Sequence, residues 1–309
     1  MMAAISAIGL TKSYEDKAVL KGIDLEIQAG TVFALLGPNG AGKTTTVQIL
    51  STLIPADGGV ARVAGHDVVD EADGVRKAIG VTGQFSAVDN LLTAEENLML
   101  MADLNHLRRR EGRRRAEDLL RRFELTEAAR KPVATFSGGM RRKLDLAMTL
   151  VGDPKVIFLD EPTTGLDPRS RRTMWEIIRG LVADHGVTIF LTTQYLDEAD
   201  QLADRIAVLD GGRIVAEGTA EELKRFVPGG RIRLRFADAG RLGVAAELFD
   251  YAAADRESLS LDIPGDNSVL TVKAVLDTLD SAGVQAESLV VETADLDDVF
   301  LTLTGEGVR

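Results

Sequence analysis

The sequence of 309 residues contains no cysteine. Disulfide bonds, thiolate metal sites and cysteine nucleophiles are therefore excluded. The absence of cysteine also fits a chain that remains in the cytoplasm, where thiols stay reduced. The hydrophobic share of 45% and the charged share of 27% are those of a globular protein.

Long apolar runs are also missing. No segment approaches the roughly 20 consecutive apolar residues that a membrane-spanning helix needs. The N-terminal segment 1–5 shows no basic patch followed by an apolar core, so we expect no secretory signal. A chain of this length is expected to hold one large domain and a smaller one.

Positive charge is in deficit, because the formal net charge is −12. Broad nucleic-acid binding draws on a positive surface, so this charge argues against it. The exception is an arginine-rich stretch over residues 108–122, which has Leu119, Leu120 and Phe123 on its apolar side. A solvated helix face is the favoured interpretation of this stretch, ahead of a contact with nucleic acid or acidic lipid.

The most informative stretch that is present is rich in glycine. It follows an apolar run at 31–36, typical of a buried strand, and leads into a helical pattern at 46–50. This order of strand, glycine-rich loop and Lys-Thr at a helix start is the context of a P-loop, so we predict a nucleoside triphosphate site. Its residues are Gly37, Pro38, Asn39, Gly40, Ala41, Gly42, Lys43, Thr44 and Thr45.

The chemistry of a P-loop explains these residue types. Glycines let successive backbone N–H groups curl around phosphate oxygens, where side chains would collide with them. Lys43 can reach the β- and γ-phosphates, and the hydroxyl of Thr44 can bind Mg²⁺. A chance glycine turn is the alternative, which the match at all fixed positions and on both flanks disfavours.

Two adjacent carboxylates end the apolar run at 156–159. Asp160 is placed to hold the Mg²⁺ shell, and Glu161 can polarise an attacking water as a general base. A strand that simply runs out into solvent is the alternative interpretation. The P-loop upstream favours the catalytic one.

A second glycine-rich helix start is Ser137-Gly138-Gly139, ahead of a helical pattern that includes Leu144 and Leu150. Such a start can bind an anion. Taken alone, it is better explained as an N-cap serine with a flexible approach.

The spacing of apolar runs indicates an α/β fold. Runs at 155–159, 187–191 and 205–209 are short and rich in β-formers, which indicates a mostly parallel sheet covered on both faces. The segment 93–129 has helical periodicity throughout and predicts a helical insertion, so we place a helical subdomain at about residues 90–150.

The character of the chain changes near residues 226–230, and we place a domain boundary there. The predicted domains are therefore 1–226, which binds nucleotide, and 227–309. In the latter, alternation at 231–236 and 258–263 predicts strands, and helical spacing at 269–279 predicts a helix. We expect a small α+β domain of ferredoxin-like type.

The order of these motifs resembles the ATP-binding subunit of ATP-binding-cassette (ABC) transporters. A P-loop, then Ser-Gly-Gly-Met, then a strand that ends in Asp-Glu is that family's arrangement, and the resemblance covers roughly residues 4 to 225. It implies a P-loop NTPase of ABC type, with a mostly parallel sheet, an antiparallel β subdomain and a helical insertion. It also implies ATP and Mg²⁺ as ligands.

The resemblance assigns roles to further residues. Tyr14 matches the aromatic residue that stacks on adenine, and Gln84 matches the glutamine that contacts Mg²⁺ and senses the membrane subunit. Ser137-Gly138-Gly139 matches the signature sequence, which grips the γ-phosphate bound by the opposite subunit. Asp167, in Gly165-Leu166-Asp167, matches the loop that touches the other P-loop.

One position departs from the family pattern, because Gln194 stands where most members have the switch histidine. Glutamine can donate a hydrogen bond to the γ-phosphate but cannot carry a proton or a charge near neutral pH. The amino-acid sequence at residues 192–200, 81–85 and 296–301 is similar to that of one branch of the family, the daunorubicin/doxorubicin-resistance ATP-binding subunits of actinobacteria. For the terminal stretch 296–301, packing of a last amphipathic helix is favoured over a direct ligand role.

The resemblance implies a homodimer that sandwiches two ATP molecules, with Glu161 and Gln194 at each hydrolysis site. It also implies an integral membrane permease as partner, a position on the cytoplasmic side of the membrane, and export of a drug-like or amphipathic compound. The alternative is a non-transport ABC-type ATPase that acts on nucleic acid or the ribosome. Three features disfavour this alternative: the short separation along the sequence between the P-loop and Asp160, the lack of cysteine, and the single set of motifs.

Overall fold

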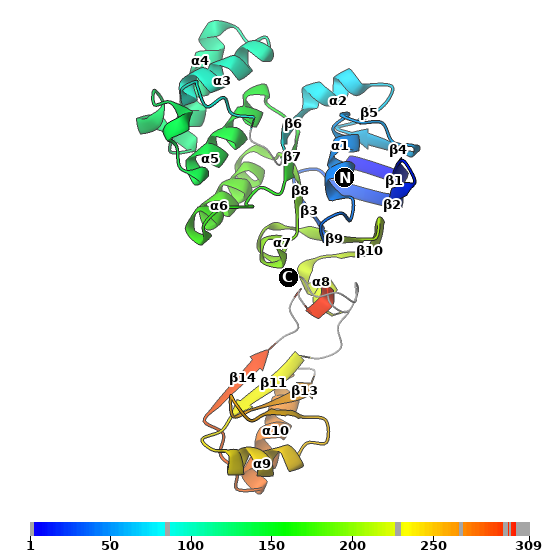
Figure 1. Ribbon diagram of the computed structural model, residues 1–309, viewed down its shortest axis with the longest axis vertical. Coiled ribbons are helices and arrows are strands. Elements are labelled where there is room, and N and C mark those ends of the chain that lie inside the picture. The colour runs from blue at the N-terminus through cyan, green and yellow to red at the C-terminus, as the bar shows by residue number, and fades with distance from the viewer. Residues whose placement is uncertain are drawn as a thin grey trace. The chain divides into compact units, whose positions relative to one another are not determined.

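The computed structural model describes residues 3–83, 87–225, 230–265, 268–292, 296 and 298–300. Two compact units are distinguished along the chain, Met1–Ala220 and Glu221–Arg309 (Figure 1). Residues 226–229, where the sequence predicts a change of domain, lie outside the described part of the chain.

A six-stranded sheet forms the centre of the first unit. Five of its strands are parallel, and only the edge strand β10 runs antiparallel to its neighbour. Every residue of the three strands β3, β7 and β8 is buried, as their continuous apolar runs predict. The strand order is β10 (Arg213–Gly218), β9 (Arg205–Asp210), β3 (Val32–Leu36), β8 (Thr188–Thr193), β7 (Val156–Asp160) and β6 (Ile79–Thr82).

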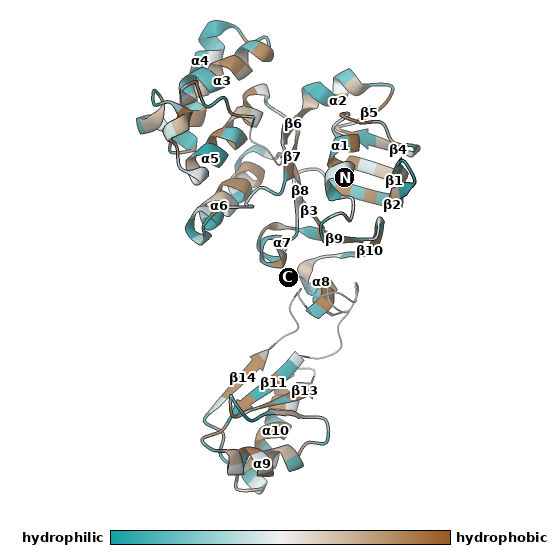
Figure 2. Cartoon of the chain, viewed as in Figure 1, coloured by the Kyte–Doolittle hydropathy of each residue, from teal (hydrophilic) through white to brown (hydrophobic). Residues whose placement is uncertain are grey.

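An antiparallel sheet covers one side of the central sheet. Its order is β2 (Lys17–Gln28), β1 (Ala3–Tyr14), β4 (Gly58–Val63) and β5 (His66–Asp67). Apolar side chains of this sheet, of helix α1 (Lys43–Leu50) and of the central sheet share one core, to which Ile5, Leu50 and Phe158 belong. Figure 2 shows hydrophobic residues along strands of the central sheet, such as β7 and β8. The short helix α2 (Ala72–Ala78) leads into β6.

The helical insertion predicted for residues 93–129 is confirmed. It contains α3 (Ala94–Leu104) and α4 (Arg109–Arg122), and α5 (Gly138–Thr149) follows it. Thr93 and Glu96 form a capping box that fixes the start of α3. On α4 the residues Ala116, Leu119 and Leu120 are buried while most of the arginines point to solvent, as an amphipathic helix requires.

Two further helices lie beside the central sheet. Helix α6 (Pro168–His185) begins with Asp167 as N-cap and a proline in its first turn, and it ends at Gly186, whose φ is 62°. Helix α7 (Leu196–Leu202) follows β8. Each is the next helix along the chain after a strand of the parallel sheet, α6 after β7 and α7 after β8, so the residues that follow these strands lie at one edge of the sheet.

The second unit contains the elements β11 (Gly230–Arg235), α9 (Ala239–Glu247), β12 (Ala253–Asp255), β13 (Ser260–Gly265), α10 (Val269–Ser281) and β14 (Ser288–Glu292). Its sheet has the order β12-β13-β11-β14 and is antiparallel throughout. This βαββαβ order is the ferredoxin-like arrangement that the sequence predicts. Its own core includes Ile232, Leu261 and Leu279. Near the C-terminus Leu296, Val299 and Phe300 are buried, which agrees with the packing interpretation of residues 296–301.

Candidate functional site

The ends of β3, β7 and β8 meet at one edge of the central sheet. Leu36, the last residue of β3, pairs with Thr193, and Asp160, the last residue of β7, pairs with Thr192. The P-loop, Glu161 and Gln194 are each the next segment along the chain from one of these strands. The parallel sheet therefore brings together residues that lie far apart in the sequence, at the edge where α/β proteins bind ligands.

The P-loop requires glycine at two positions. The N–H of Gly37 donates to the carbonyl of Thr193 at 3.3 Å, and a Cβ on Gly37 would lie 2.3 Å from the carbonyl oxygen of Leu209. Gly42 is the N-cap of α1 with a φ of 114°, a conformation that side-chain-bearing residues rarely adopt. The start of α1 thus presents backbone N–H groups toward the loop, which suits an anion.

Lys43 is buried at the first position of α1, with a side chain that is 5% exposed. Its Nζ donates to the carbonyl oxygens of Gly37 at 2.8 Å and of Pro38 at 3.1 Å. The same nitrogen lies 3.9 Å from Oε1 of Glu161. Burial lowers the pKa of Lys43, while the carboxylates of Glu161 and Asp160 act in the opposite direction. The loop carbonyls and the two carboxylates therefore hold the amine inside the loop against the cost of its burial.

Asp160 is buried, with 3% of its surface exposed. Its Oδ1 lies within hydrogen-bond distance of two hydroxyl groups. The hydroxyl of Thr44 lies 3.3 Å from this oxygen, and the hydroxyl of Thr192 donates a short hydrogen bond to it. Thr44 and Asp160 come from different elements, so their proximity is a product of the fold. A hydroxyl and a carboxylate oxygen side by side are the donors that Mg²⁺ prefers.

Glu161 adopts a strained backbone conformation at the start of the loop after β7. Its φ is 50°, in the left-handed region, which costs a residue other than glycine about 1–3 kcal/mol. The N–H of Glu161 donates to the carbonyl oxygen of Thr192 at 3.1 Å and lies 3.2 Å from its hydroxyl. The hydroxyl of Thr164 donates to Oε2 of Glu161 at 3.2 Å. These contacts hold the carboxylate toward the P-loop.

A hollow of about 370 Å³ lies over the P-loop. Glu161 is the acidic residue among those that line it, and Lys43 lies opposite. The lining residues are Lys17, Val19, Asn39, Gly40, Gly42, Lys43, Thr44, Thr45 and Glu161. A phosphate group in this hollow would meet the loop, the lysine and the glutamate together.

The signature residues do not line this hollow. Ser137 is the N-cap of α5, and its hydroxyl accepts from the N–H of Met140 at 3.3 Å. A Cβ on Gly139 would lie 2.8 Å from Oγ of Ser170 on α6, so the two helix starts are packed closely. Within one chain, the structure therefore brings the P-loop and Glu161 together but not the signature sequence.

Asp167 caps α6 with its own carboxylate. It accepts from the N–H groups of Arg169 and Ser170, both at 3.0 Å, and from the hydroxyl of Ser170 at 2.6 Å. The hydrogen bonds from Ser170 chiefly lower the pKa of Asp167. The side chain is thus used locally in this chain.

Three other predicted residues are placed as follows. Tyr14 ends β1 and is 46% exposed, with Nζ of Lys12 at 5.7 Å from its ring centre. Gln194 directly follows β8 and is half-buried. Gln84 lies outside the described residues, so its contact with Mg²⁺ stays a prediction.

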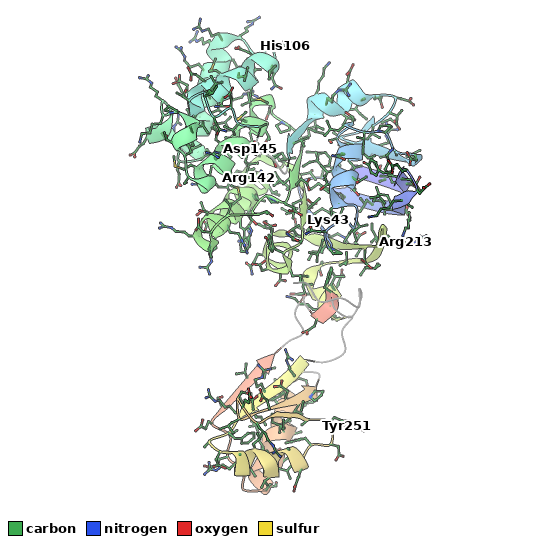
Figure 3. The ribbon with its side chains drawn as sticks, viewed as in Figure 1. Lys43, His106, Arg142, Asp145, Arg213 and Tyr251 are labelled. Atoms are coloured by element: carbon green, nitrogen blue, oxygen red, sulfur yellow. The ribbon has the colours of Figure 1, made fainter. Side chains whose placement is uncertain are left out.

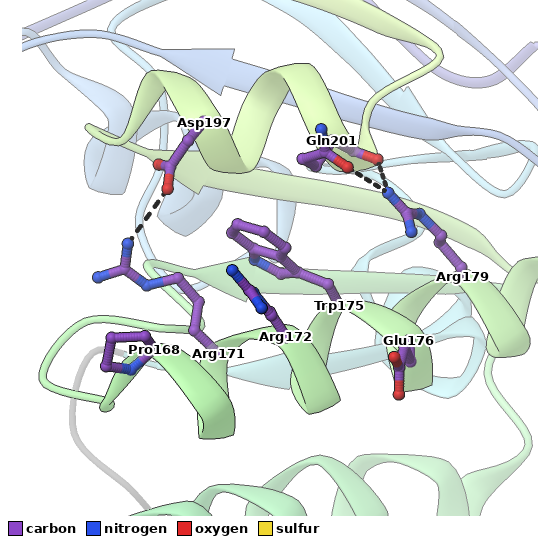
Figure 4. Close-up of a pocket in the computed structure, with 8 residues that line it drawn as sticks. All are labelled: Pro168, Arg171, Arg172, Trp175, Glu176, Arg179, Asp197 and Gln201. Carbon is purple, nitrogen blue, oxygen red and sulfur yellow. Dashed lines mark hydrogen bonds and ion pairs between the residues drawn. The ribbon is translucent and has the colours of Figure 1, made fainter.

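A second hollow lies between α6 and α7 (Figure 4). Arg171 lies 3.3 Å from Asp197, and Arg179 donates to Gln201. Trp175, beside them, donates from Nε1 to Oε1 of the buried Glu198 at 3.1 Å. The lining residues are Pro168, Arg171, Arg172, Trp175, Glu176, Arg179, Asp197 and Gln201.

The sequence analysis missed several residues of the site. Lys17 and Val19 line the P-loop hollow from β2, and Thr192 holds both Asp160 and Glu161. Arg142, one of three consecutive basic residues, contacts the carbonyl of Pro162. No motif marks these positions, because each acts through a contact that depends on the fold.

The fold and the site define the class of P-loop nucleotide-binding ATPases. The sequence profile of the family described as ABC transporter matches residues 20–164. The daunorubicin resistance ATP-binding protein DrrA3 of Streptomyces coeruleorubidus is 49% identical over 99% of this chain and 97% of its own length. The daunorubicin/doxorubicin resistance ATP-binding protein DrrA of Streptomyces peucetius is 47% identical over 98% of this chain and 92% of its own.

A solved structure of an ATP-binding subunit of an ABC transporter is also similar. Its TM-score is 0.64 at 29% sequence identity, over 72% of this chain and 92% of that chain. The chain belongs to the ATP-binding proteins of the ABC transporter family, and it binds and hydrolyses ATP as members of that family do. The predicted fold class and the predicted family are confirmed.

Across the described residues, the helices are too short or too polar to cross a lipid bilayer.

Proposed function

We propose that this chain drives the export of a drug-like, amphipathic compound through a separate membrane subunit. Two copies would close around two ATP molecules, and hydrolysis would reopen them. The similarity to two daunorubicin resistance proteins over nearly the full length supports this class of cargo. The names of these relatives give no support to an action on nucleic acid.

One observation carries the proposed dimer. The hollow over the P-loop is lined by Lys43 and Glu161 but not by Ser137, Gly138 or Gly139. An ABC signature sequence acts on a γ-phosphate. In this chain the signature residues do not border the hollow in which the chain's own P-loop would hold that phosphate. A second copy that places its signature sequence over this hollow would complete the site.

Lys43 and Glu161 have the central roles in hydrolysis. Lys43 would move from the carbonyls of its own loop to the β- and γ-phosphates of ATP, with little change in burial. Glu161 would accept hydrogen bonds from the attacking water and orient it toward the γ-phosphate. The left-handed backbone at Glu161 would help to aim this carboxylate before the substrate arrives.

Thr44 and Asp160 would hold Mg²⁺, together with Gln84. The first two bring a hydroxyl and a carboxylate oxygen to 3.3 Å of each other, which fits a hard cation with oxygen ligands. Bound there, Mg²⁺ supplies positive charge next to the phosphate oxygens. Thr192 orients the carboxylate of Asp160 through its hydrogen bond.

The remaining site residues would surround the nucleotide. Tyr14, which is exposed at the end of β1, would stack on adenine, and the amide of Gln194 would donate to the γ-phosphate. Ser137 and Gly139 of the partner copy would bind the same phosphate where charge develops in the transition state. Asp167 would contact the P-loop of the partner copy.

The two domains would have different functions. Residues 1–226 would bind and hydrolyse ATP, and residues 227–309 would form an accessory domain. The chain would be held at the cytoplasmic face of the membrane by its permease subunit, with contacts near Gln84 and the helical subdomain at about residues 90–150.

The experiment that tests the proposal uses Glu161→Gln. This variant should bind ATP with Mg²⁺ and form a stable dimer, because closure occurs but hydrolysis does not release it. Size-exclusion chromatography with light scattering should give the mass of two chains with ATP and of one chain without it. Glu176→Gln, at an exposed glutamate on α6, is the matched control and should keep full turnover.

Cells that contain the chain and its membrane partner give the second measurement. Wild-type protein should raise tolerance to daunorubicin, and Glu161→Gln should not. A variant that stays monomeric with ATP contradicts the dimer, and rapid turnover by Glu161→Gln contradicts its role as base. Unchanged daunorubicin tolerance with an active ATPase contradicts daunorubicin as the exported compound.

A further inference from the structure

Arg142 is the side chain on α5 that touches the catalytic turn. Its Nε donates to the carbonyl of Pro162 at 2.9 Å. Its Nη2 lies 3.3 Å from the carbonyl of Asp160 and 3.5 Å from that of Glu161. One guanidinium group therefore contacts three consecutive carbonyls around the proposed base.

The other terminal nitrogen of Arg142 reaches a different segment. Nη1 donates to the carbonyl of Gly83 at 3.2 Å and to Oδ2 of Asp145 at 3.1 Å. Oδ1 of Asp145 accepts from the N–H of Ala87 at 3.2 Å. The pair Arg142–Asp145 thus holds the residues on both sides of segment 84–86, which includes Gln84.

This pair is enclosed by the protein. The Arg142 side chain is 12% exposed and the Asp145 side chain 3% exposed. Figure 3 shows both on α5, next to each other. Burial lowers the pKa of the Arg142 guanidinium, and the carboxylate of Asp145 is the largest influence that opposes it. Enclosing a charged pair costs free energy unless its hydrogen bonds are satisfied, and here the carbonyls satisfy them.

The chemistry of the contacts requires arginine. A planar guanidinium presents its donors in a fixed fork, so it can bind carbonyls from two segments at once. A lysine ammonium in the same place is a point charge and cannot span them. Arg142 lies five positions after Ser137 on α5, so the same helix that presents the signature sequence also holds the turn of Glu161.

We propose that Arg142, oriented by Asp145, is a positioning residue for ATP hydrolysis, which fixes the turn that carries Glu161 and ties it to Gly83 and, through Asp145, to Ala87. The inference rests on the proposed role of Glu161 as base. Arg142 does not touch the substrate, and its effect reaches the reaction through the backbone of residues 160–162. A displacement of Gly83 or Ala87 would therefore be transmitted to Glu161 through this pair.

The test compares Arg142→Lys with Arg115→Lys in the full chain. Arg115 is also partly buried, donates to a backbone carbonyl, that of Val151, and pairs with Glu111 on its own helix, but it lies away from the site. Arg142→Lys should lower kcat by about 10- to 100-fold, because small displacements of catalytic groups have effects of this size. Its KM for ATP should stay close to that of wild type. Arg115→Lys should leave both values unchanged.

Asp145→Asn provides an independent variant that keeps the shape of the side chain. It should lower kcat less than Arg142→Lys, because the amide oxygen of asparagine can still accept a hydrogen bond from Arg142 or Ala87. The double variant should be no slower than Arg142→Lys alone, because the two residues act as a unit. Binding of a fluorescent ATP analogue shows that each variant is folded.

The outcomes separate this inference from the proposed function. If Glu161→Gln is inactive while Arg142→Lys keeps full kcat, the positioning role is overturned and the proposed function stands. If Arg142→Lys loses ATP binding as well as turnover, its role is structural and the inference is overturned. If Glu161→Gln remains active, the proposed base is wrong, and the part of the inference that acts through Glu161 falls with it.

Discussion

Glu198 carries a fully buried carboxyl group next to the catalytic turn. Its Oε1 accepts from the hydroxyl of Thr163 at 2.7 Å and from Nε1 of Trp175 at 3.1 Å. Burial raises the pKa of Glu198, and the hydrogen bonds from Thr193, Thr163 and Trp175 offset only part of this effect. The folded protein therefore retains a proton on Glu198 at pH values where the unfolded chain has lost it.

The raised pKa predicts a pH-dependent gain in stability for Glu198→Gln. In wild type, stability is lost as the pH rises above the ordinary range of a glutamate, about 4.3, through the higher pKa of the folded state. Glutamine keeps the acceptor oxygen and has no proton to lose. The midpoint of thermal unfolding should therefore be higher in the variant, by about 2–4 °C for each kcal/mol recovered, with a difference that grows with pH.

Calorimetry between pH 5 and pH 8 checks this prediction. Glu198→Ala is the control, and it should be less stable than wild type at every pH, because Thr163 and Trp175 lose their acceptor and a cavity remains. A difference between Glu198→Gln and wild type that is constant over the pH range would show that Glu198 is ionised in the fold.

Under the proposed function, Gln194 would change the pH response of the site. Most members of the family have a histidine here, which gains a charge near neutral pH. Glutamine stays neutral, so the proposed contact of Gln194 with the γ-phosphate would not depend on protonation of that side chain. The pH dependence of hydrolysis should then come from other groups of the site.

At the scale of elements, the loop between β7 and α6 is bonded to helices on two sides of the site. It begins with the strained Glu161, it contains Thr163, which is bonded to Glu198 on α7, and it ends at Asp167, the N-cap of α6. Trp175 on α6 is bonded to the same carboxyl group. A movement of the loop is therefore passed to Trp175 through two hydrogen bonds.

This connection predicts a fluorescence signal from the nucleotide site. Trp175 is the single tryptophan of the chain, so its emission reports on its surroundings alone. Addition of ATP with Mg²⁺ should change the emission of Trp175. In Thr163→Val, which has a similar shape but lacks the hydroxyl donor, the change should be much smaller while the affinity for ATP is kept.

Steady-state emission spectra during an ATP titration give the measurement. The affinity is measured separately with a fluorescent ATP analogue. An equal change in wild type and in Thr163→Val would mean that the signal reaches Trp175 by a path other than Glu198.

At the scale of the whole molecule, each chain carries one P-loop and one signature sequence. Ser137 caps α5 in this chain, while the P-loop hollow is lined by other residues. The proposed function therefore makes a specific prediction about Ser137→Arg. The variant should lose hydrolysis by about 100-fold or more, because the contact to the phosphate of the partner copy is blocked.

The affinity of the monomeric variant for ATP should stay at the wild-type value, because the residue acts on the other chain. Ser268→Arg is the matched control, since Ser268 is the N-cap of α10 in the second unit and makes the same kind of hydrogen bond, to Thr271. Each substitution removes one cap, worth about 1 kcal/mol. ATPase assays and nucleotide titrations distinguish the two, and a loss of ATP affinity in monomeric Ser137→Arg would mean that the signature acts within its own chain.

Some elements of the second unit could not be predicted from local pattern. Helix α9 contains Gly240 and Gly243, which lower helix propensity, and it is held instead by the cap of Asp238 and the burial of Leu242 and Ala245. Strand β12 is exposed at every position, so it shows no alternation. Both elements form through tertiary contacts: β12 pairs with β13, and α9 packs Leu242 and Ala245 into the core of the second unit.

The sequence by itself determined the P-loop, the buried strands and the pair of carboxylates at the end of β7. These features depend on local spacing, since a glycine-rich turn, an apolar run and a helix start each involve neighbours along the chain. A resemblance over nearly the whole first unit then identified the family.

The tertiary structure alone decided which distant groups meet. Arg142 contacts Gly83 across 59 positions of the chain, and Thr163 contacts Glu198 across 35. Neither contact leaves a pattern in the sequence, because a buried polar side chain can be satisfied by any donor or acceptor that the fold brings near. Packing of α5, α6 and α7 against the parallel sheet makes that choice, and so determines how the carboxylate of Glu161 is held.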